Sequence, residues 1–326
     1  MPIPLDEGAR IVIREWLRAR EGERITIISD ELHVAEAMAM REQAQLVGAS
    51  PIVILVESSS PQCGELFDDR FDAFLNTDAI VGATHNSIMT TRAIRDSVKA
   101  GARFLSIPLS TNDGIPLLQH DFIRMNTNEV NRIGLQIRSL FIDASEAHVT
   151  TDLGTDIQFS IKGRLGNVFH GLCDQPGVST SASFEFSISV VENKTEGVVI
   201  LDGSMGYIGL VEEPVRILID RGRIVSIEQN TSGRRLAKYL SDFQDERMYI
   251  IGELGIGLNK MASCAGRSYI EDECSYGTFH IGIGRNISLG GQHYANGHFD
   301  LVMHRPTIKV DSHNVMKDGK IEIFEF

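Results

Sequence analysis

Residues 51–58 read PIVILVES, a run of apolar and β-branched residues without alternating polar positions. Such a run is typical of a strand buried on both faces in a parallel sheet. Working outward, similar strand patterns occupy 23–30, 73–84 and 102–109, and helical patterns occupy 5–20, 31–48 and 87–101. Because strands alternate with helices, residues 1–145 are predicted to form an α/β domain with a parallel sheet.

The composition changes after a long predicted helix at 127–148. Segments with period-two alternation and glycine-containing turns then dominate, as in PVRILIDRGRIVSIE (214–228) and RPTIKVD (305–311). One helix is expected at 232–245. The second half, 146–326, is therefore predicted to be a strand-rich α+β domain.

Composition limits the functions that are plausible. The chain has 326 residues, with 31 basic and 44 acidic side chains and a net charge of -13. This acidic balance argues against nucleic acid and anionic membranes as partners, and favours a small-molecule or short peptide substrate. Four cysteines without CxxC spacing indicate a reducing compartment. No signal peptide or apolar run of about 20 residues is found, so we expect a cytoplasmic protein.

Candidate metal ligands gather in the second half. His298 and Asp300 are two positions apart in GHFDLV, and on a strand this spacing puts both side chains on one face, about 7 Å apart at the backbone. His280 lies in GTFHIGIG (277–284), and Glu253 begins ELGIGLN (253–259). Two imidazoles and two carboxylates could bind zinc, manganese or ferrous iron. Taken singly, His280 could be a core histidine and Glu253 a solvated acid. The acidic run at 271–273 is expected to be a solvated loop from which Glu273 could approach the site.

The order ELGIGLN, GTFHIGIG, GHFDLV resembles the C-terminal half of the thermophilic aminopeptidase family (aminopeptidases S and T). GATHNSIMTTRAIRDSVKAGARFLSIP (82–108) and TDLGTDIQFSIKGR (151–164) extend the resemblance over most of the chain. It implies a two-metal hydrolase, with Glu253, His280, His298 and Asp300 as metal ligands. It also implies a homo-oligomer, a dimer or a multiple of one, and the exposed strand edges expected in the second half favour the same.

At two positions the chain differs from this family in a way that argues against a two-metal site. The family's bridging glutamate should fall within GVSTSASFEF (177–186), where no glutamate precedes Glu185, and Ile287 stands where the family has its catalytic tyrosine. A single metal held by Glu253, His298 and Asp300, with His280 nearby, is the simpler hypothesis.

The chain also resembles the 2,5-dihydroxypyridine 5,6-dioxygenases, which are ring-cleaving iron enzymes. In them a histidine replaces Glu253 beside the histidine–aspartate pair. This resemblance implies that His85 is the catalytic base, at the end of a predicted strand where open α/β sheets bind ligands, and that His170 is a second active-site histidine. A capping or core role for His85 stays open.

Three functions follow. The first is a metal-dependent, aminopeptidase-like hydrolase that cleaves a C–N bond of a small amide or peptide with metal-activated water. The alternative is a mononuclear non-haem iron dioxygenase that cleaves a hydroxylated N-heteroaromatic ring. The third is a non-catalytic metal-binding scaffold. Glu253 and His280 favour the hydrolase, which is our prediction from sequence.

Overall fold

The computed structural model describes residues 2–58, 76–89 and 91–322. The chain divides into two compact units, Met1–Asn128 with Phe169–Ser183 and Glu129–Val168 with Phe184–Phe326. The domain boundary expected at residue 145 stays a prediction. The predicted fold class is confirmed, because a parallel sheet with helices is joined to strand-rich antiparallel sheets.

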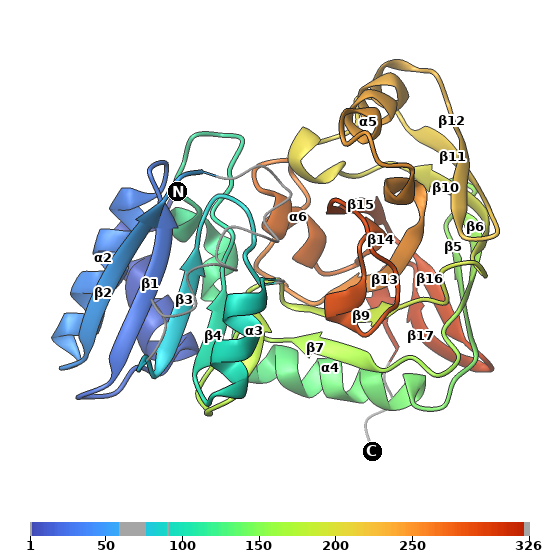
Figure 1. Cartoon of the computed structure of the whole chain (residues 1–326). Coiled ribbons are helices and arrows are strands. Elements are labelled where there is room, and N and C mark those ends of the chain that lie inside the picture. The colour runs from blue at the N-terminus through green and yellow to red at the C-terminus, as the bar shows by residue number, and fades with distance from the viewer. Residues whose placement is uncertain (1, 59–75, 90, 323–326) are drawn as a thin grey trace. The chain divides into compact units, whose positions relative to one another are not determined.

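The first unit contains a five-stranded parallel sheet in the order β2-β1-β3-β4-β8. Figure 1 labels the first four of these strands. Its strands are β1 (Arg24–Asp30), β2 (Ser50–Val56), β3 (Ala79–Ala83), β4 (Arg103–Ser106) and β8 (Ser179–Ser181). Its helices are α1 (Leu5–Arg10), the π-helical turn η1 (Ile11–Trp16), α2 (Val34–Leu46), α3 (Arg92–Lys99), η3 (Leu117–Gln119) and η4 (Asp121–Arg124). Because the strands are parallel, β1 and β3 end at the same edge of the sheet.

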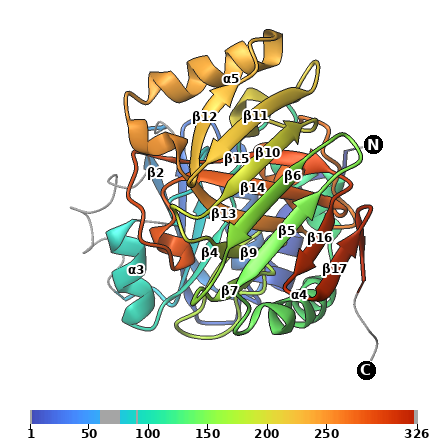
Figure 2. The ribbon, with the colours of Figure 1, turned by 90° about the vertical axis from the view of Figure 1, so that its right-hand side faces the viewer.

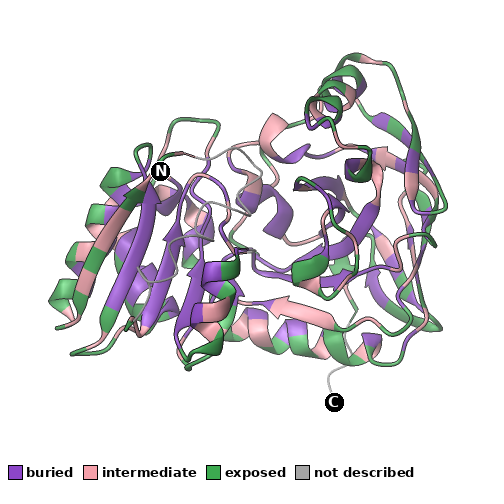
Figure 3. Cartoon of the chain, viewed as in Figure 1, coloured by how far each residue is buried: buried purple, intermediate pink, exposed green. Residues whose placement is uncertain are grey.

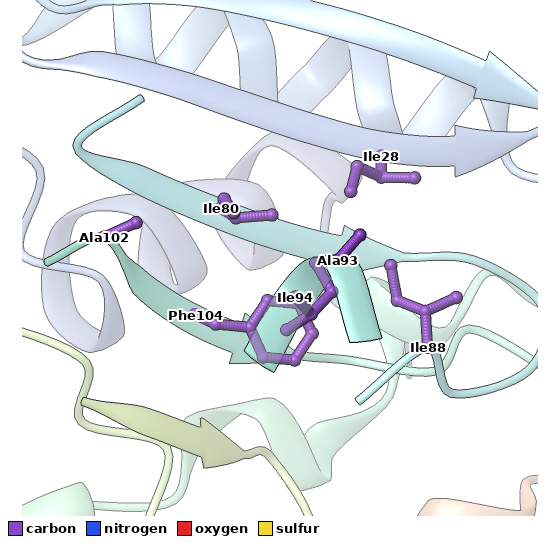
Figure 4. Packing of buried hydrophobic residues seen from close by; sticks show 7 residues of the cluster. All are labelled: Ile28, Ile80, Ile88, Ala93, Ile94, Ala102 and Phe104. Carbon is purple, nitrogen blue, oxygen red and sulfur yellow. The ribbon is translucent and has the colours of Figure 1, made fainter. Parts of the chain in front are cut away.

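Figure 4 shows the packing between this sheet and α3. Ile94 of α3 lies against Phe104 of β4, and Ile80 of β3 belongs to the same cluster of buried residues. Thr91 caps the helix by accepting a hydrogen bond from the Ile94 amide. Burial of side chains of this size contributes about 1.5–3 kcal/mol each to folding. The cluster therefore stabilises the packing of α3 against the sheet.

The segment at 51–58 forms the expected strand, but its predicted burial is wrong. β2 is the outermost strand of its sheet, and Ile52 and Leu55 are each 53% exposed. Figure 3 shows the difference between the mixed colours of β2 and the buried β1 and β3. Residue type alone did not reveal which strand lies at the edge, because the order of strands is set by non-local pairing.

The second unit contains two sheets. The larger has eight strands in the order β12-β11-β10-β6-β5-β16-β17-β18, most of which Figure 2 shows side by side. Its strands are β5 (Glu146–Thr150), β6 (Asp156–Ser160), β10 (Glu196–Leu201), β11 (Val215–Asp220), β12 (Arg223–Ile227), β16 (Thr307–Val310), β17 (His313–Lys317) and β18 (Lys320–Ile321). All the neighbours in it pair antiparallel.

The smaller sheet carries the candidate metal ligands and has the order β15-β14-β13-β9-β7. Its strands are β7 (Gly166–Phe169), β9 (Glu185–Ser189), β13 (Ile251–Gly257), β14 (Thr278–Gly284) and β15 (His298–His304). The helices of this half of the chain are α4 (Thr127–Phe141), α5 (Thr231–Asp242), α6 (Tyr269–Cys274), η5 (Gly206–Ile208), η6 (Glu246–Tyr249) and η7 (Ile287–Leu289). Every residue of β9, β13 and β14 is buried, so the polar groups on these strands need partners within the protein.

Within the residues described, no helix combines the length and the apolar character required to cross a membrane.

Candidate metal centre and candidate active-site histidines

The first group of ligands forms over a glycine in the middle strand β14. Gly282 pairs with Glu253 of β13 on one side and with Asp300 of β15 on the other. A Cβ atom at Gly282 would lie 2.6 Å from the Glu253 carboxylate and 2.7 Å from the His298 ring. The missing side chain therefore leaves room for Glu253, His298 and Asp300 to converge from the two flanking strands.

The distances suit a small cation. His298 Nε2 lies 3.0 Å from Glu253 Oε2 and 3.3 Å from Asp300 Oδ1, and one donor atom from each residue lies within 4.8 Å of the other two. His298 Nδ1 lies 2.8 Å from the carbonyl oxygen of Arg285, to which it donates. This bond fixes the tautomer that leaves Nε2 as the ligand atom, as in most protein metal sites.

Asp300 supplies the second sign that the group fits a metal. Its side chain is buried, and the Tyr269 hydroxyl donates a hydrogen bond to Oδ2. Oδ1 receives no well-formed hydrogen bond from the described residues, and its basic neighbour is His298 Nε2 at 3.3 Å. A buried carboxylate oxygen without a donor is costly, and a divalent cation between Oδ1, His298 and Glu253 would satisfy it.

His280 belongs to a second group that shares Glu253. Its Nε2 lies 2.9 Å from Glu185 Oε2 and 3.9 Å from Glu253 Oε1. These three residues also meet the distance requirement for a cation. Gly255 faces this group, since a Cβ there would lie 1.8 Å from His280 Nε2. His280 therefore flanks the Glu253–His298–Asp300 group, and it lies closer to the Glu185 carboxylate than to that of Glu253.

His280, His298 and the Glu253 carboxylate that they share shift one another's pKa values. Burial by itself would raise the pKa of Glu253, but hydrogen bonds and charges from His280 and His298 lower it below the usual range. Burial by itself would lower the pKa of His298, but Asp300 and Glu253 raise it well above its usual value. Without a cation the imidazoles thus hold protons between carboxylates, and metal binding would release them.

Sequence reasoning did not assign two residues that touch these groups, Glu185 and Tyr269. Glu185 begins EFSIS, in which Glu185, Ser187 and Ser189 alternate with apolar residues on a buried strand. Three polar residues on one face of a buried strand were a signal that could have been used. Ser187 donates a hydrogen bond to Glu253 Oε1, which confirms that this face meets the ligands.

The acidic run Glu271–Glu273 is not the solvated loop that was expected. It lies in α6, and all three side chains are buried. Burial, together with the charges of Glu185 and Asp300, raises the pKa of Glu273 well above its usual value. The prediction was wrong because a run of acids was judged by composition, whereas α6 packs against β13, β14 and β15.

His85 lies in the first unit, just beyond the end of β3. Its backbone N–H donates to Asp30 Oδ2 at 2.6 Å, and its Nδ1 is 3.2 Å from His33 Nε2. Burial and the neighbouring His33 lower its pKa, and Asp30 opposes this shift. His85 is therefore neutral at pH 7, as a general base must be.

His170 also lies in the first unit. Its Nδ1 accepts a hydrogen bond from the Leu172 amide at 3.1 Å. Its proton therefore sits on Nε2, and burial lowers its pKa. In this tautomer the Nε2 edge of the His170 ring is a hydrogen-bond donor.

The comparisons with known proteins favour one of the predicted functions over the others. A family model described as 2,5-dihydroxypyridine 5,6-dioxygenase matches residues 15–323. The chain belongs to the 2,5-dihydroxypyridine 5,6-dioxygenase family. A curated 2,5-dihydroxypyridine 5,6-dioxygenase from Pseudomonas putida is 23% identical to this family member over 208 residues, covering 60% of the chain and 59% of that protein. The match thus spans less than two thirds of that relative.

Two solved structures share the fold. The 2,5-dihydroxypyridine dioxygenase from Pseudomonas putida superposes with a TM-score of 0.85 at 18% identity, covering 99% of both chains. Wild-type AmpT from Thermus thermophilus superposes with a TM-score of 0.70 at 15% identity, covering 97% of this chain and 98% of its own. At such identities the superpositions concern the fold alone.

The prediction of an aminopeptidase-like hydrolase is wrong, because the family match favours the dioxygenase that was its alternative. The prediction depended on Glu253 and His280. A carboxylate and an imidazole bind zinc, manganese and ferrous iron alike, so these two ligands could not identify the reaction. The expected divalent-metal cofactor agrees with the family and with the two ligand groups.

A side chain that fills the space above Gly282 should weaken metal binding. No positive φ is found at this glycine, so Gly282→Ala adds a clash with Glu253 and His298 without backbone strain. We expect metal affinity to fall at least as much as the roughly 10–100-fold seen when outer-shell partners of ligands are lost. Titration with Fe(II) under nitrogen measures this change. Gly290→Ala is unsuitable as a control because Gly290 has a positive φ, and Ser226→Ala at an exposed position of β12 is the better one. Wild-type affinity in Gly282→Ala would show that the cation binds elsewhere.

Proposed function

We propose that this protein is a mononuclear non-haem iron dioxygenase that opens a hydroxylated N-heteroaromatic ring. The match of the 2,5-dihydroxypyridine 5,6-dioxygenase family over residues 15–323 carries this proposal. The Glu253–His298–Asp300 group supports it, since three protein ligands leave coordination positions for a substrate and oxygen. A bound ferrous ion supplies the redox chemistry that allows molecular oxygen to react with the ring.

The ligand set has one histidine and two carboxylates, whereas the facial triad of many iron oxygenases has two histidines and one carboxylate. Glu253 brings the additional negative charge. His280 lies between Glu253 and Glu185, and its imidazolium form would compensate part of the charge that burial would otherwise penalise. We propose that Glu253, His298 and Asp300 bind the iron and that His280 holds Glu253 in place.

The histidines of the first unit supply proton transfer in this proposal. The substrate ring becomes more electron-rich when its hydroxyl group loses a proton. Neutral His85 accepts that proton as general base. His170 presents an Nε2–H and so donates a hydrogen bond to a ring substituent.

Oxygen consumption by iron-loaded protein tests the function. The chain is purified under nitrogen, loaded with Fe(II), and mixed with 2,5-dihydroxypyridine in air-saturated buffer. We expect one oxygen molecule to be consumed per ring opened, and with ¹⁸O₂ both heavy atoms should appear in the product. Protein loaded with Zn(II) is the control, because zinc does not change its oxidation state.

Incorporation of one heavy oxygen without ring opening would identify a hydroxylase instead. Absence of oxygen uptake with iron-loaded protein and a panel of hydroxylated pyridines would contradict a dioxygenase of this substrate class.

We also propose that the chain forms a homo-oligomer, a dimer or a multiple of one, because the strand-rich half has sheet edges that a partner would cover. Multi-angle light scattering at micromolar concentration should give a mass of at least twice 36.0 kDa. A monodisperse 36.0 kDa particle would contradict this expectation.

A further inference from the structure

Three side chains of the first unit form a chain of hydrogen bonds that ends at His85. His33 Nδ1 lies 3.2 Å from Glu36 Oε2, and His33 Nε2 lies 3.2 Å from His85 Nδ1. The two ring centroids are 5.4 Å apart and the planes are inclined by 23°, so the imidazoles meet through their edges. Glu36 and His33 lie at the start of α2, and His85 follows β3.

The donors and acceptors in this series of hydrogen bonds can be assigned. Glu36 is 3% exposed and His33 is 8% exposed, so water does not easily replace either partner. An ionised carboxylate can only accept a hydrogen bond, whereas an imidazole nitrogen that bears hydrogen donates one. The shared proton therefore resides on His33 Nδ1, and the Glu36 carboxylate accepts it. In a neutral imidazole the other nitrogen is then an acceptor, so His33 Nε2 accepts from His85.

The same rule applied to His85 places its own proton on Nδ1. Its Nε2 then carries a lone pair, and no hydrogen bond to this atom is found among the described residues. We propose that Glu36 and His33 are positioning residues that hold His85 in the tautomer with a basic Nε2. This inference rests on the proposed function only in that it makes Nε2 the atom that takes the substrate proton.

The surroundings of His85 also suit a transient positive charge. When Nε2 takes a proton, the Nδ1–H bond to His33 is kept, and Glu36 lies directly behind His33. Asp30 at the end of β1 accepts the backbone N–H of His85 with Oδ2 and that of Leu32 with Oδ1. The Asp30 carboxylate thus lies beside the backbone of His85, where its charge favours the imidazolium, and Glu36 lies one imidazole away. A nucleophile or base oriented by a second and third group follows the same logic as a catalytic triad.

Protonation of His33 would reverse the arrangement. As an imidazolium, His33 would donate from both nitrogens, and His85 Nδ1 would have to accept. The proton of His85 would then move to Nε2, which could no longer act as a base. The two directions of the chain therefore differ in which nitrogen of His85 bears hydrogen, and this difference can be measured.

Nitrogen NMR of the full chain tests the proposal. Protein labelled with ¹⁵N-histidine and loaded with diamagnetic Zn(II) is studied at pH 8 by two-bond ¹H–¹⁵N correlation, and His85→Gln assigns the signals. We expect His85 to carry hydrogen on Nδ1. A wild-type spectrum in which His85 carries hydrogen on Nε2 would overturn the proposal, even if no variant can be purified.

Variants separate positioning from folding. His33→Leu removes the acceptor, and the Nδ1–H population of His85 should fall at least twofold. His33→Gln keeps an amide oxygen that can accept, and should restore that population. His148→Leu removes a partly exposed histidine that pairs with Asp156 in the other unit, and should change nothing. An unchanged His85 spectrum in folded His33→Leu would refute a positioning role.

Kinetics with Fe(II)-loaded protein distinguish this inference from the function itself. We expect kcat/KM for ring opening to fall roughly 10-fold in His33→Leu, a part of the roughly 10²–10⁴-fold that a general base contributes. His33→Gln should stay within about threefold of wild type, and iron content should be unchanged in both. An inactive wild type with the expected tautomer would reject the proposed function and leave the positioning role supported. An active wild type with the opposite tautomer would reject the positioning role alone.

Discussion

Asp300→Asn is expected to abolish iron binding and, with it, ring opening. Asparagine keeps the size of the side chain and can still accept the Tyr269 hydrogen bond, but it removes the negative charge. The neutral amide is a far weaker ligand for a divalent cation. Because a lost outer-shell partner costs about 10–100-fold in affinity, a lost direct ligand should cost more. Calorimetric titration with Fe(II) under nitrogen measures the affinity, and oxygen uptake measures the activity.

The fold should survive this change. Asp300 lies near other buried acids, and its charge is among the causes that raise the pKa of Glu273, so removing it relieves repulsion. A cooperative thermal transition in Asp300→Asn checks this point. Asp318→Asn is the matched control, because Asp318 is an exposed carboxylate that pairs with Arg305 on the surface. Iron affinity of Asp300→Asn equal to that of the control would exclude Asp300 as a ligand.

His85→Ala should retain iron and lose about 10²–10⁴-fold in kcat, the usual contribution of a general base. The iron ligands are proposed to come from the second unit, whereas His85 belongs to the first, so metal content should not change. The residual rate should rise with pH, since solvent then removes the substrate proton. His313→Ala, on an exposed position of β17, is the matched control.

The pH profile of the wild type follows from the direction of the shift at His85. Burial and His33 lower its pKa below the usual value of about 6.5. The basic form therefore predominates above that pH, so the rate should be level there and fall as the solution becomes more acidic. Loss of the acidic limb in His85→Ala would support the assignment. A variant as active as wild type, with the same pH profile, would leave His85 as a structural residue.

Local patterns predicted much of the architecture. The apolar segments at 23–30 and 102–109 contain β1 and β4, and the helix expected at 232–245 corresponds to α5 at Thr231–Asp242. These elements were predictable because strands and helices have fixed side-chain periods. The short helix α6 was missed. Its sequence YIEDEC is rich in acids and has no apolar period long enough to detect, and it is stabilised by packing against the smaller sheet.

The sequence by itself determined that His298 and Asp300 share one face, because successive side chains of any strand point to opposite sides. It also determined the alternation of strands and helices in the first half. Only the tertiary structure decided that Gly282 separates Glu253 from Asp300, that Glu185 meets His280, and that Glu36 reaches His85 through His33. These contacts join residues from different strands and helices, and their register depends on the pairing of whole elements. The spacing of residues along the chain does not reveal that pairing. The candidate ligands could therefore be predicted from the sequence, but the residues that contact them could not.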